Sequence, residues 1–334
     1  MLKRIENSQG LVYYESPLLR SAGLPHAFTT RLGGVSAPPF DSLNFQPASR
    51  SVAHLGPGPA VEMRDTGAPS RQGGADRLPA PLAPVAAALP LRSSAPPADQ
   101  YQTVVENFRR VATALDCTSR RTVCIWQVHG RAVCVWPEQA KDVTPDDPTT
   151  VVAQADALVT ADANVLISVR VADCVPVLIA SRDGSAVAAV HAGWRGVTAN
   201  IIEATLDSFR ERFQVNASDL LAAIGPCISA EHFEVGFEVA DAFDAANLSE
   251  AVHREFQPRP HIDLQHAIAL QLERAGVPAS HIDRNDRCTF RDREEFYSHR
   301  RDEGRTGRMA AVIGAKGSAN CEVKTMSSTV QPAA

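Results

Sequence analysis

The apolar positions along the chain follow two periodicities, one helical and one extended. Residues 100–115 carry apolar side chains at spacings of four, three and four, which predicts a helix with a single apolar stripe. Further helices are expected over 197–213 and 237–246. A fourth is expected over 264–275, directly after Asp263, a favourable N-cap residue. Each of these helices has one face to bury against another element.

The extended pattern consists of short runs rich in β-branched and other apolar residues. Such runs occur at 122–128, 156–160, 165–172, 177–180, 186–191 and 221–224. Several of them are apolar at nearly every position, which indicates a sheet that is covered on both faces. Because strands and helices mix without a regular βαβ alternation, the predicted class is α+β with a mixed sheet.

Two segments differ in composition from the rest of the chain. Residues 47–98 hold ten prolines and five glycines but no Phe, Tyr or Trp, so they offer little to bury. We expect a mobile or partly disordered insertion there and a frayed tail over 315–334.

Charge and cysteine content narrow the class of protein. The formal net charge of −5 gives no reason to expect nucleic acid or an anionic membrane as the main partner. No apolar stretch reaches the ~20 residues that span a bilayer, and residues 1–10 lack the apolar core of a secretion signal, so we expect a cytoplasmic protein. The seven cysteines are scattered without a CxxC pair, which argues against a disulfide scaffold.

Three candidate metal ligands stand at or near the ends of apolar runs. They are His129, Cys174 and His191. Two imidazoles and a thiolate suit zinc, and three protein ligands leave a fourth position for a water whose pKa falls toward ~7. Their spacing matches no compact zinc motif, however, and a buried cysteine with two hydrogen-bonded histidines would give the same pattern.

A cysteine hydrolase without a metal is an equally consistent interpretation of these residues. Cys174 or Cys227 would be the nucleophile, with His191 or His129 as its base. A nucleophilic cysteine and a zinc ligand both require a stabilised thiolate, so the residue types leave both possibilities open.

Two arginines are candidates for binding an anion. Arg195 stands near the start of a predicted helix, where backbone N–H groups and a guanidinium together favour phosphate or carboxylate. Arg31 precedes Gly33 and Gly34, a pair typical of a tight turn. A structural salt bridge would explain Arg195 equally well, and a surface arginine beside an ordinary turn would explain Arg31.

Several sequence blocks together resemble the laccase-domain family, first labelled multicopper polyphenol oxidase and now interpreted as purine nucleoside phosphorylases. The central blocks are QVHG at 127–130, ADA at 155–157, ADCVP at 172–176, HAGWRG at 191–196 and GPCI at 225–228. TTRLGGVS at 29–36 and SLN at 42–44 resemble its N-terminal signature. Cys288-Thr289, SHRRD at 298–302 and TGRMA at 306–310 resemble its C-terminal one.

The resemblance implies a fold, a cofactor and a reaction. The fold is a single-domain α/β/β/α sandwich with mixed sheets over 1–314, interrupted by the 47–98 insertion. The cofactor is zinc, held by His129, Cys174 and His191. The reaction is phosphorolysis of adenosine, inosine, guanosine and methylthioadenosine, together with deamination of adenosine.

The same resemblance assigns roles to further residues. Arg195 joins the three metal ligands as a catalytic residue, and Arg31, Asn44 and Arg195 are expected to bind substrate or phosphate. Asp173 is a candidate for a carboxylate that supports the metal ligands. The general acid is not assigned, because the HxE signature of the usual zinc deaminases is absent.

Two features of the sequence depart from the family pattern, and one alternative function is consistent with it. The 47–98 insertion follows the SLN block directly, and His299 stands where the family pattern leads us to expect an aromatic residue. A copper-dependent polyphenol oxidoreductase is the alternative function, with copper in place of zinc. The sequence contains no HxH pair, which multicopper oxidation normally needs. The physiological nucleoside and the oligomeric state stay open.

Overall fold

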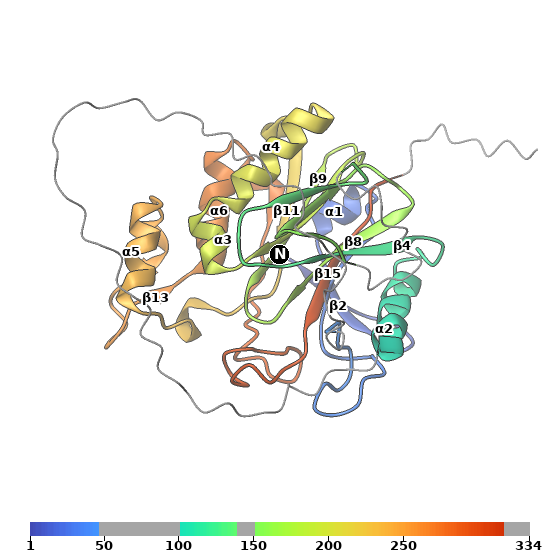
Figure 1. Ribbon diagram of the computed structural model, residues 1–334, viewed down its shortest axis with the longest axis horizontal. Coiled ribbons are helices and arrows are strands. Elements are labelled where there is room, and N and C mark those ends of the chain that lie inside the picture. Colours follow the sequence, from blue (N-terminus) through green and yellow to red (C-terminus); the bar gives the residue numbers. More distant parts are fainter. Residues whose placement is uncertain (47–100, 139–150, 317–334) are drawn as a thin grey trace, which may run out of the picture.

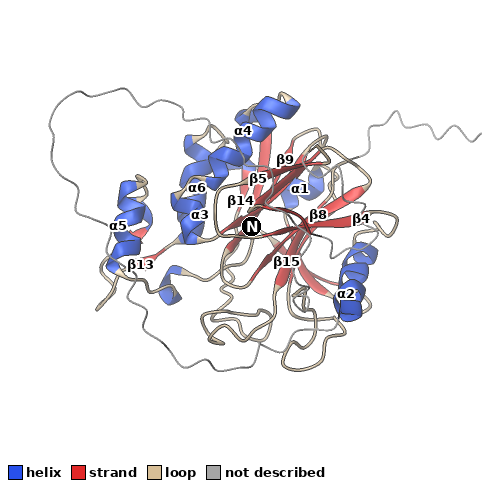
Figure 2. Cartoon of the chain, in the orientation of Figure 1, coloured by secondary structure: helices blue, strands red, loops and turns tan. Residues whose placement is uncertain are grey.

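Two mixed β-sheets form the centre of the molecule. The computed structural model describes residues 1–46, 101–138 and 151–316, so the expectations for 47–98 and for most of the 315–334 tail lie outside the described residues. Within the described part, no helix is long and apolar enough to cross a membrane. Strands occupy the middle of Figure 2, and helices lie around them.

The first sheet has seven strands, which connect the amino end, the middle and the carboxyl end of the described chain. In spatial order they are β1 (Lys3–Glu6), β2 (Val12–Glu15), β3 (His26–Thr29), β15 (Met309–Ile313), β8 (Val165–Val171), β4 (Arg121–Trp126) and β6 (Val151–Gln154). β15 is antiparallel to both β3 and β8, whereas β4 is parallel to β8 and β6. The sheet is therefore mixed, as predicted.

The second sheet has six strands and is also mixed. Their order is β14 (Ile282–Asp283), β11 (Leu220–Ile224), β9 (Val175–Ser181), β10 (Val187–Ala192), β7 (Ala157–Thr160) and β5 (Val133–Trp136). A separate ribbon joins β12 (Val252–His253) and β13 (His261–Ile262). The consecutive strands β9 and β10 form an antiparallel hairpin, a local contact of the kind that sequence pattern predicts well.

Helices cover the outer faces of the two sheets. On the six-stranded sheet they are α3 (Trp194–Thr198), α4 (Ile201–Phe213), α5 (Phe237–Ala245) and α6 (Leu264–Arg274). Helix α2 (Tyr101–Ala114) packs on the outer face of the seven-stranded sheet, and the short α1 (Pro17–Ser21) lies near β11. Figure 1 shows α2 on the opposite side of the strands from α3, α4 and α6.

Alternate residues of the central strands pack into different layers of the core. In β9, Val177 and Ile179 pack toward the helices, whereas Leu178 and Ala180 pack between the two sheets. Burial on both faces explains why these runs are apolar at nearly every position. The predicted class, a single mixed α+β domain, is confirmed.

One predicted helix is divided in the structure. The helix expected over 197–213 is two helices, α3 and α4, because Asn200 between them adopts a left-handed backbone with φ of 64°. The Gln271 side chain donates hydrogen bonds to Asn200 Oδ1 at 2.7 Å and to the Val197 carbonyl at 2.8 Å, which holds the break in place. The prediction for α6 is confirmed, since Asp263 accepts a hydrogen bond from the His266 N–H.

Candidate metal and substrate site

Three side chains from distant parts of the sequence meet at one end of the two sheets. One donor atom each from His129, Cys174 and His191 lies within 4.8 Å of the others. The two imidazole rings stand edge to face, with centroids 4.8 Å apart and an interplanar angle of 85°. The structure thus brings together the three residues that were predicted to hold a metal.

The strand pairing explains how these residues meet. In the β9–β10 hairpin Val175 faces Ala192, so Cys174 and His191 lie close to each other at the same end. His129 follows β4 of the other sheet and adopts a left-handed backbone with φ of 59°. Gly193 lets the loops approach: a Cβ there would lie 3.1 Å from His129 Cδ2 and 3.2 Å from Cys174 Sγ.

A buried carboxylate links two of the three residues. Asp156 Oδ1 lies 2.9 Å from His191 Nδ1 and accepts a hydrogen bond from the His129 N–H at 2.9 Å, while Oδ2 accepts from the Gly130 N–H at 2.7 Å. Burial opposes ionisation of Asp156, but these contacts outweigh it and lower the pKa of its carboxyl. Asp156 thereby occupies Nδ1 of His191, which leaves Nε2 as the ring nitrogen that can face Cys174 or a metal.

The electrostatics of the site favour a thiolate. Burial disfavours the charge on Cys174, but the His191 and His129 imidazoles outweigh it and lower the pKa of the thiol to about 6. Burial likewise opposes a charged His191, and the Cys174 thiolate together with the Asp156 carboxylate raises the pKa of that imidazole. Each of these two groups therefore favours the charged form of the other.

A cavity of about 480 Å³ opens beside these three residues. Its size is within the range of pockets that bind small molecules. The aromatic side chains that line it are Trp126, Trp194 and Phe233, and the arginines are Arg170, Arg195, Arg300 and Arg308. His299, the departure from the family pattern, lines it as well. Flat apolar surfaces and several cations therefore face the same space.

Asp173, predicted to support the metal ligands, has a different set of partners. Its carboxylate accepts hydrogen bonds from the Thr289 hydroxyl at 2.6 Å, from the Ser298 hydroxyl at 3.1 Å and from the Arg300 N–H at 2.7 Å. Its backbone is left-handed with φ of 90°. Asp173 therefore connects the Cys174 loop to the C-terminal signature segment.

The predicted substrate contacts divide into one that lines the cavity and two that do not. Arg195 lines it and stacks over Trp194 at 4.3 Å. The Arg31 guanidinium lies over the Tyr297 ring at 4.7 Å and donates to the carbonyl of Asp41 at 2.9 Å. Asn44 is fully buried, and its Oδ1 accepts a hydrogen bond from the Arg308 N–H at 2.8 Å.

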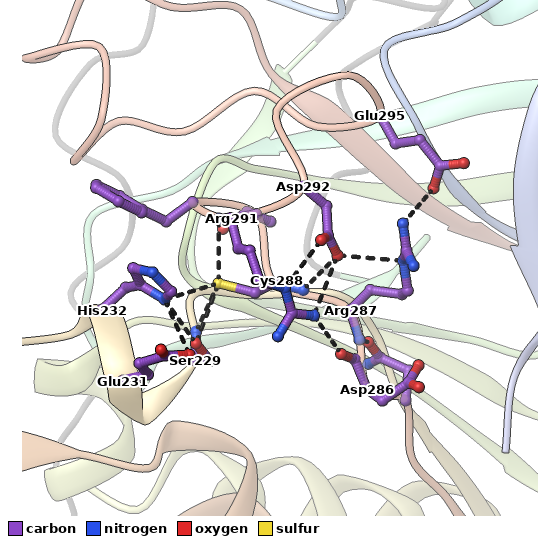
Figure 3. Close-up of polar contacts among 12 residues, drawn as sticks. Ser229, Glu231, His232, Asp286, Arg287, Cys288, Arg291, Asp292 and Glu295 are labelled. Carbon is purple, nitrogen blue, oxygen red and sulfur yellow. Dashed lines mark hydrogen bonds and ion pairs between the residues drawn. The ribbon is translucent and has the colours of Figure 1, made fainter.

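Cys227, the alternative nucleophile, is enclosed by the protein. It has no exposed surface, and burial raises the pKa of its thiol well above the ordinary value. Neighbouring Cys288 is also buried, and its Sγ accepts from the Ser229 N–H at 3.3 Å and lies 3.7 Å from His232 Nδ1 (Figure 3). Neither thiol lines the cavity.

The sequence patterns gave no individual role to three residues that the structure places at the site. Asp156 was quoted only as part of a sequence block, and Arg170 and Arg308 received no role. Arg170 did carry a signal, because a charged residue inside the apolar run VLISVRVA is unusual for a buried strand. Arg308 had no comparable signal, since its place depends on a long-range strand pairing.

Comparison with known proteins supports the family that the sequence blocks resemble. The family model described as multi-copper polyphenol oxidoreductase laccase matches residues 76–316. The chain is 35% identical over 300 residues to a purine nucleoside phosphorylase of Deinococcus radiodurans, covering 89% of this chain and 92% of that protein. A purine nucleoside phosphorylase of Pseudomonas aeruginosa is 34% identical over 288 residues, with 85% and 90% covered.

The solved structure of YlmD from Geobacillus stearothermophilus has the same fold. It superposes with a TM-score of 0.69 at 31% identity and covers 94% of this chain and 99% of that one. Sequence blocks, fold and relatives agree along most of the chain. The chain therefore belongs to the multi-copper polyphenol oxidoreductase laccase family, and its relatives are named purine nucleoside phosphorylases.

Proposed function

We propose that the protein is a zinc-dependent purine nucleoside phosphorylase that also deaminates adenosine. One observation carries the proposal: the His129, Cys174 and His191 donors share a cavity with aromatic side chains and arginines. The names of the relatives support phosphorolysis in particular. The proposed substrates are adenosine, inosine, guanosine and methylthioadenosine, each split by phosphate into a purine base and a pentose 1-phosphate.

The donor set fits zinc. One thiolate and two imidazoles are ligands that zinc prefers, and the lowered pKa of Cys174 supplies the thiolate near neutral pH. Asp156 fixes the orientation of His191, as carboxylates commonly do for histidine ligands of zinc. When bound, zinc supplies Lewis-acid chemistry that activates water or polarises a substrate atom.

The side chains around the donors suit a purine nucleoside and phosphate. Aromatic rings such as Trp194 and Phe233 stack against a flat base, and arginines bind phosphate oxygens in pairs. In this proposal Arg195, which lines the cavity, also contacts the substrate or phosphate. In this proposal Asn44 and Arg31 act from outside the cavity, where Asn44 holds the backbone of Arg308 and Arg31 holds the loop at Asp41.

The proposal is tested by incubating the metal-replete protein with adenosine, with and without inorganic phosphate, and separating the products by chromatography. We expect adenine only when phosphate is present, and inosine in both samples. If neither adenine, hypoxanthine nor inosine forms, the proposal is wrong.

A copper-dependent polyphenol oxidoreductase is the alternative that the name of the family model suggests. In the described part of the chain, His129, Cys174 and His191 are the one group of His, Cys and acidic side chains close enough to hold a metal ion. This favours a single ion over a multicopper centre. Copper titration with a phenol and measurement of oxygen uptake separates the two: uptake that depends on copper would support the alternative.

A further inference from the structure

Arg170 and Arg308 stand next to each other on one face of the seven-stranded sheet. Arg170 belongs to β8 and faces Ala310 of β15 in the antiparallel ladder. Arg308 directly precedes β15, two residues before Ala310, and lies close enough to Arg170 for the charge of that guanidinium to lower its pKa. Both side chains line the cavity that contains Cys174. Two like charges are therefore held side by side.

Few groups of the protein compensate these charges. Arg170 Nη2 is 3.4 Å from the Ile125 carbonyl, and Arg308 Nη1 donates to the Thr306 and Gly307 carbonyls at 3.0 Å. Within the described part of the chain, neither guanidinium forms an ion pair with a carboxylate. Burial lowers the pKa of both guanidiniums, and for Arg308 it outweighs the opposing effect of the Cys174 and Asp173 charges.

The nearest carboxylate in the cavity has other partners. Asp173 already accepts hydrogen bonds from Thr289, Ser298 and the backbone of Arg300. Each guanidinium carries five N–H donors, and the described residues supply acceptors for few of them. Two partly buried guanidiniums on one cavity wall repel each other, and a shared anion removes that repulsion. The cavity therefore contains a site that a compact, doubly charged anion would complete.

We infer that Arg170 and Arg308 together bind the phosphate that attacks the nucleoside. The inference rests on the proposed function and assigns its phosphate subsite to two residues. A phosphate oxygen forms a bond to the anomeric carbon while the carbon–nitrogen bond to the purine breaks. The electron pair of that bond leaves with the base, which takes up the proton carried by hydrogen phosphate. The two guanidiniums hold the remaining phosphate oxygens through paired hydrogen bonds.

The other arginines near the site are less suited to this role. Arg195 is exposed and stacks on Trp194, so water competes for its donors. Arg300 is also exposed and donates to the Glu234 carbonyl at 2.8 Å. Arg31 lies outside the cavity. By contrast, the β8–β15 pairing holds Arg170 in the cavity wall, and a hydrogen bond to Asn44 holds the backbone of Arg308.

Binding of inorganic phosphate to the full-length protein, measured by isothermal titration calorimetry, tests the assignment without turnover. We expect Arg170→Met and Arg308→Met each to weaken phosphate binding about tenfold to a hundredfold, because each removes charged hydrogen bonds. Methionine keeps most of the apolar stem, and thermal unfolding shows whether each variant is folded. Arg170→Lys and Arg308→Lys retain the positive charge, so they should lose less of the affinity for phosphate than the methionine variants.

Activity assays separate this inference from the proposed function. Both methionine variants should raise the KM for phosphate while the deamination of adenosine without phosphate changes little. Arg182→Met, an exposed arginine at the opposite end of β9 from Cys174, is the matched control. Wild-type phosphate affinity in both cavity variants, or its loss in Arg195→Met or Arg31→Met instead, overturns the assignment. Absence of phosphorolysis in the wild type would refute the proposed function. The calorimetric affinities would still show whether Arg170 and Arg308 bind phosphate.

Discussion

Asp156 Oδ1 lies 2.9 Å from Nδ1 of His191, and both side chains are buried. The same carboxylate holds the backbone of His129 and Gly130, so one residue positions two of the three donors. Asp156→Asn should therefore weaken metal binding about tenfold to a hundredfold, as loss of a carboxylate behind a histidine ligand commonly does. Competition with a chromogenic chelator measures the affinity. Asp241→Asn on the exposed face of α5 is the control, and equal affinities in both variants would contradict the role of Asp156.

Gly193 controls how closely the donors approach. A Cβ at this position would lie 3.1 Å from His129 and 3.2 Å from the Cys174 sulfur, closer than ordinary contacts. Gly193→Ala should push one of the two side chains away and weaken metal binding, with a smaller effect on thermal stability. In the control Gly236→Ala the three nearest atoms belong to the flexible Glu238 carboxyl group, which can move aside. Unchanged metal affinity in Gly193→Ala would show that the loops adjust freely.

The ionisation of Cys174 gives the site a specific pH dependence. Although burial opposes the charge, the two imidazoles lower the pKa of its thiol from 9.0 to about 6. In metal-free protein the thiolate is therefore present above about pH 6 and is protonated below it, where protons compete with the metal and affinity falls. Ultraviolet thiolate absorbance should rise through that pH in the wild type and not in Cys174→Ala. His191→Ala should move the rise to higher pH; a wild-type rise near pH 9 would disagree.

Asn44 contributes to the site through the backbone of Arg308. Its Oδ1 accepts hydrogen bonds from the Arg308 N–H at 2.8 Å and the Gln46 N–H at 3.0 Å. Asn44→Ala removes a buried side chain and leaves two partly buried donors without this acceptor, so the free energy of unfolding should fall by about 1–3 kcal/mol. Denaturant unfolding measures this change. Asn216→Ala, at an exposed position whose side chain makes no cap hydrogen bond, should change it by less than about 0.5 kcal/mol.

Local patterns predicted the elements better than they predicted the site. The stripe over 100–115 and the runs that form β8 and β10 appear close to their predicted bounds, because spacing of apolar residues reflects burial directly. The break at Asn200 was missed, since an asparagine can occupy either a helical or a left-handed backbone.

Residue types suggested His129, Cys174 and His191 as candidate metal ligands, the family resemblance made that prediction specific, and the structure brings the three together. The placement of Arg308 beside Arg170 depends on pairing between β15 and β8. These strands are far apart in the sequence, and no local pattern reports that contact. For the same reason Asp156 could be quoted in a sequence block without its hydrogen bonds to His191 being foreseen.

Removal of the metal separates the proposed function from catalysis by a free cysteine. If His129, Cys174 and His191 hold zinc, dialysis against a chelator should abolish both phosphorolysis and deamination, and stoichiometric zinc should restore both. Elemental analysis should find about one zinc per chain in the wild type and much less in Cys174→Ala, because the thiolate is the one charged ligand of the three. A metal-independent cysteine enzyme would instead keep its activity in chelator and lose it only on alkylation of Cys174. Thermal unfolding of Cys174→Ala shows whether lost zinc reflects a lost ligand or a lost fold.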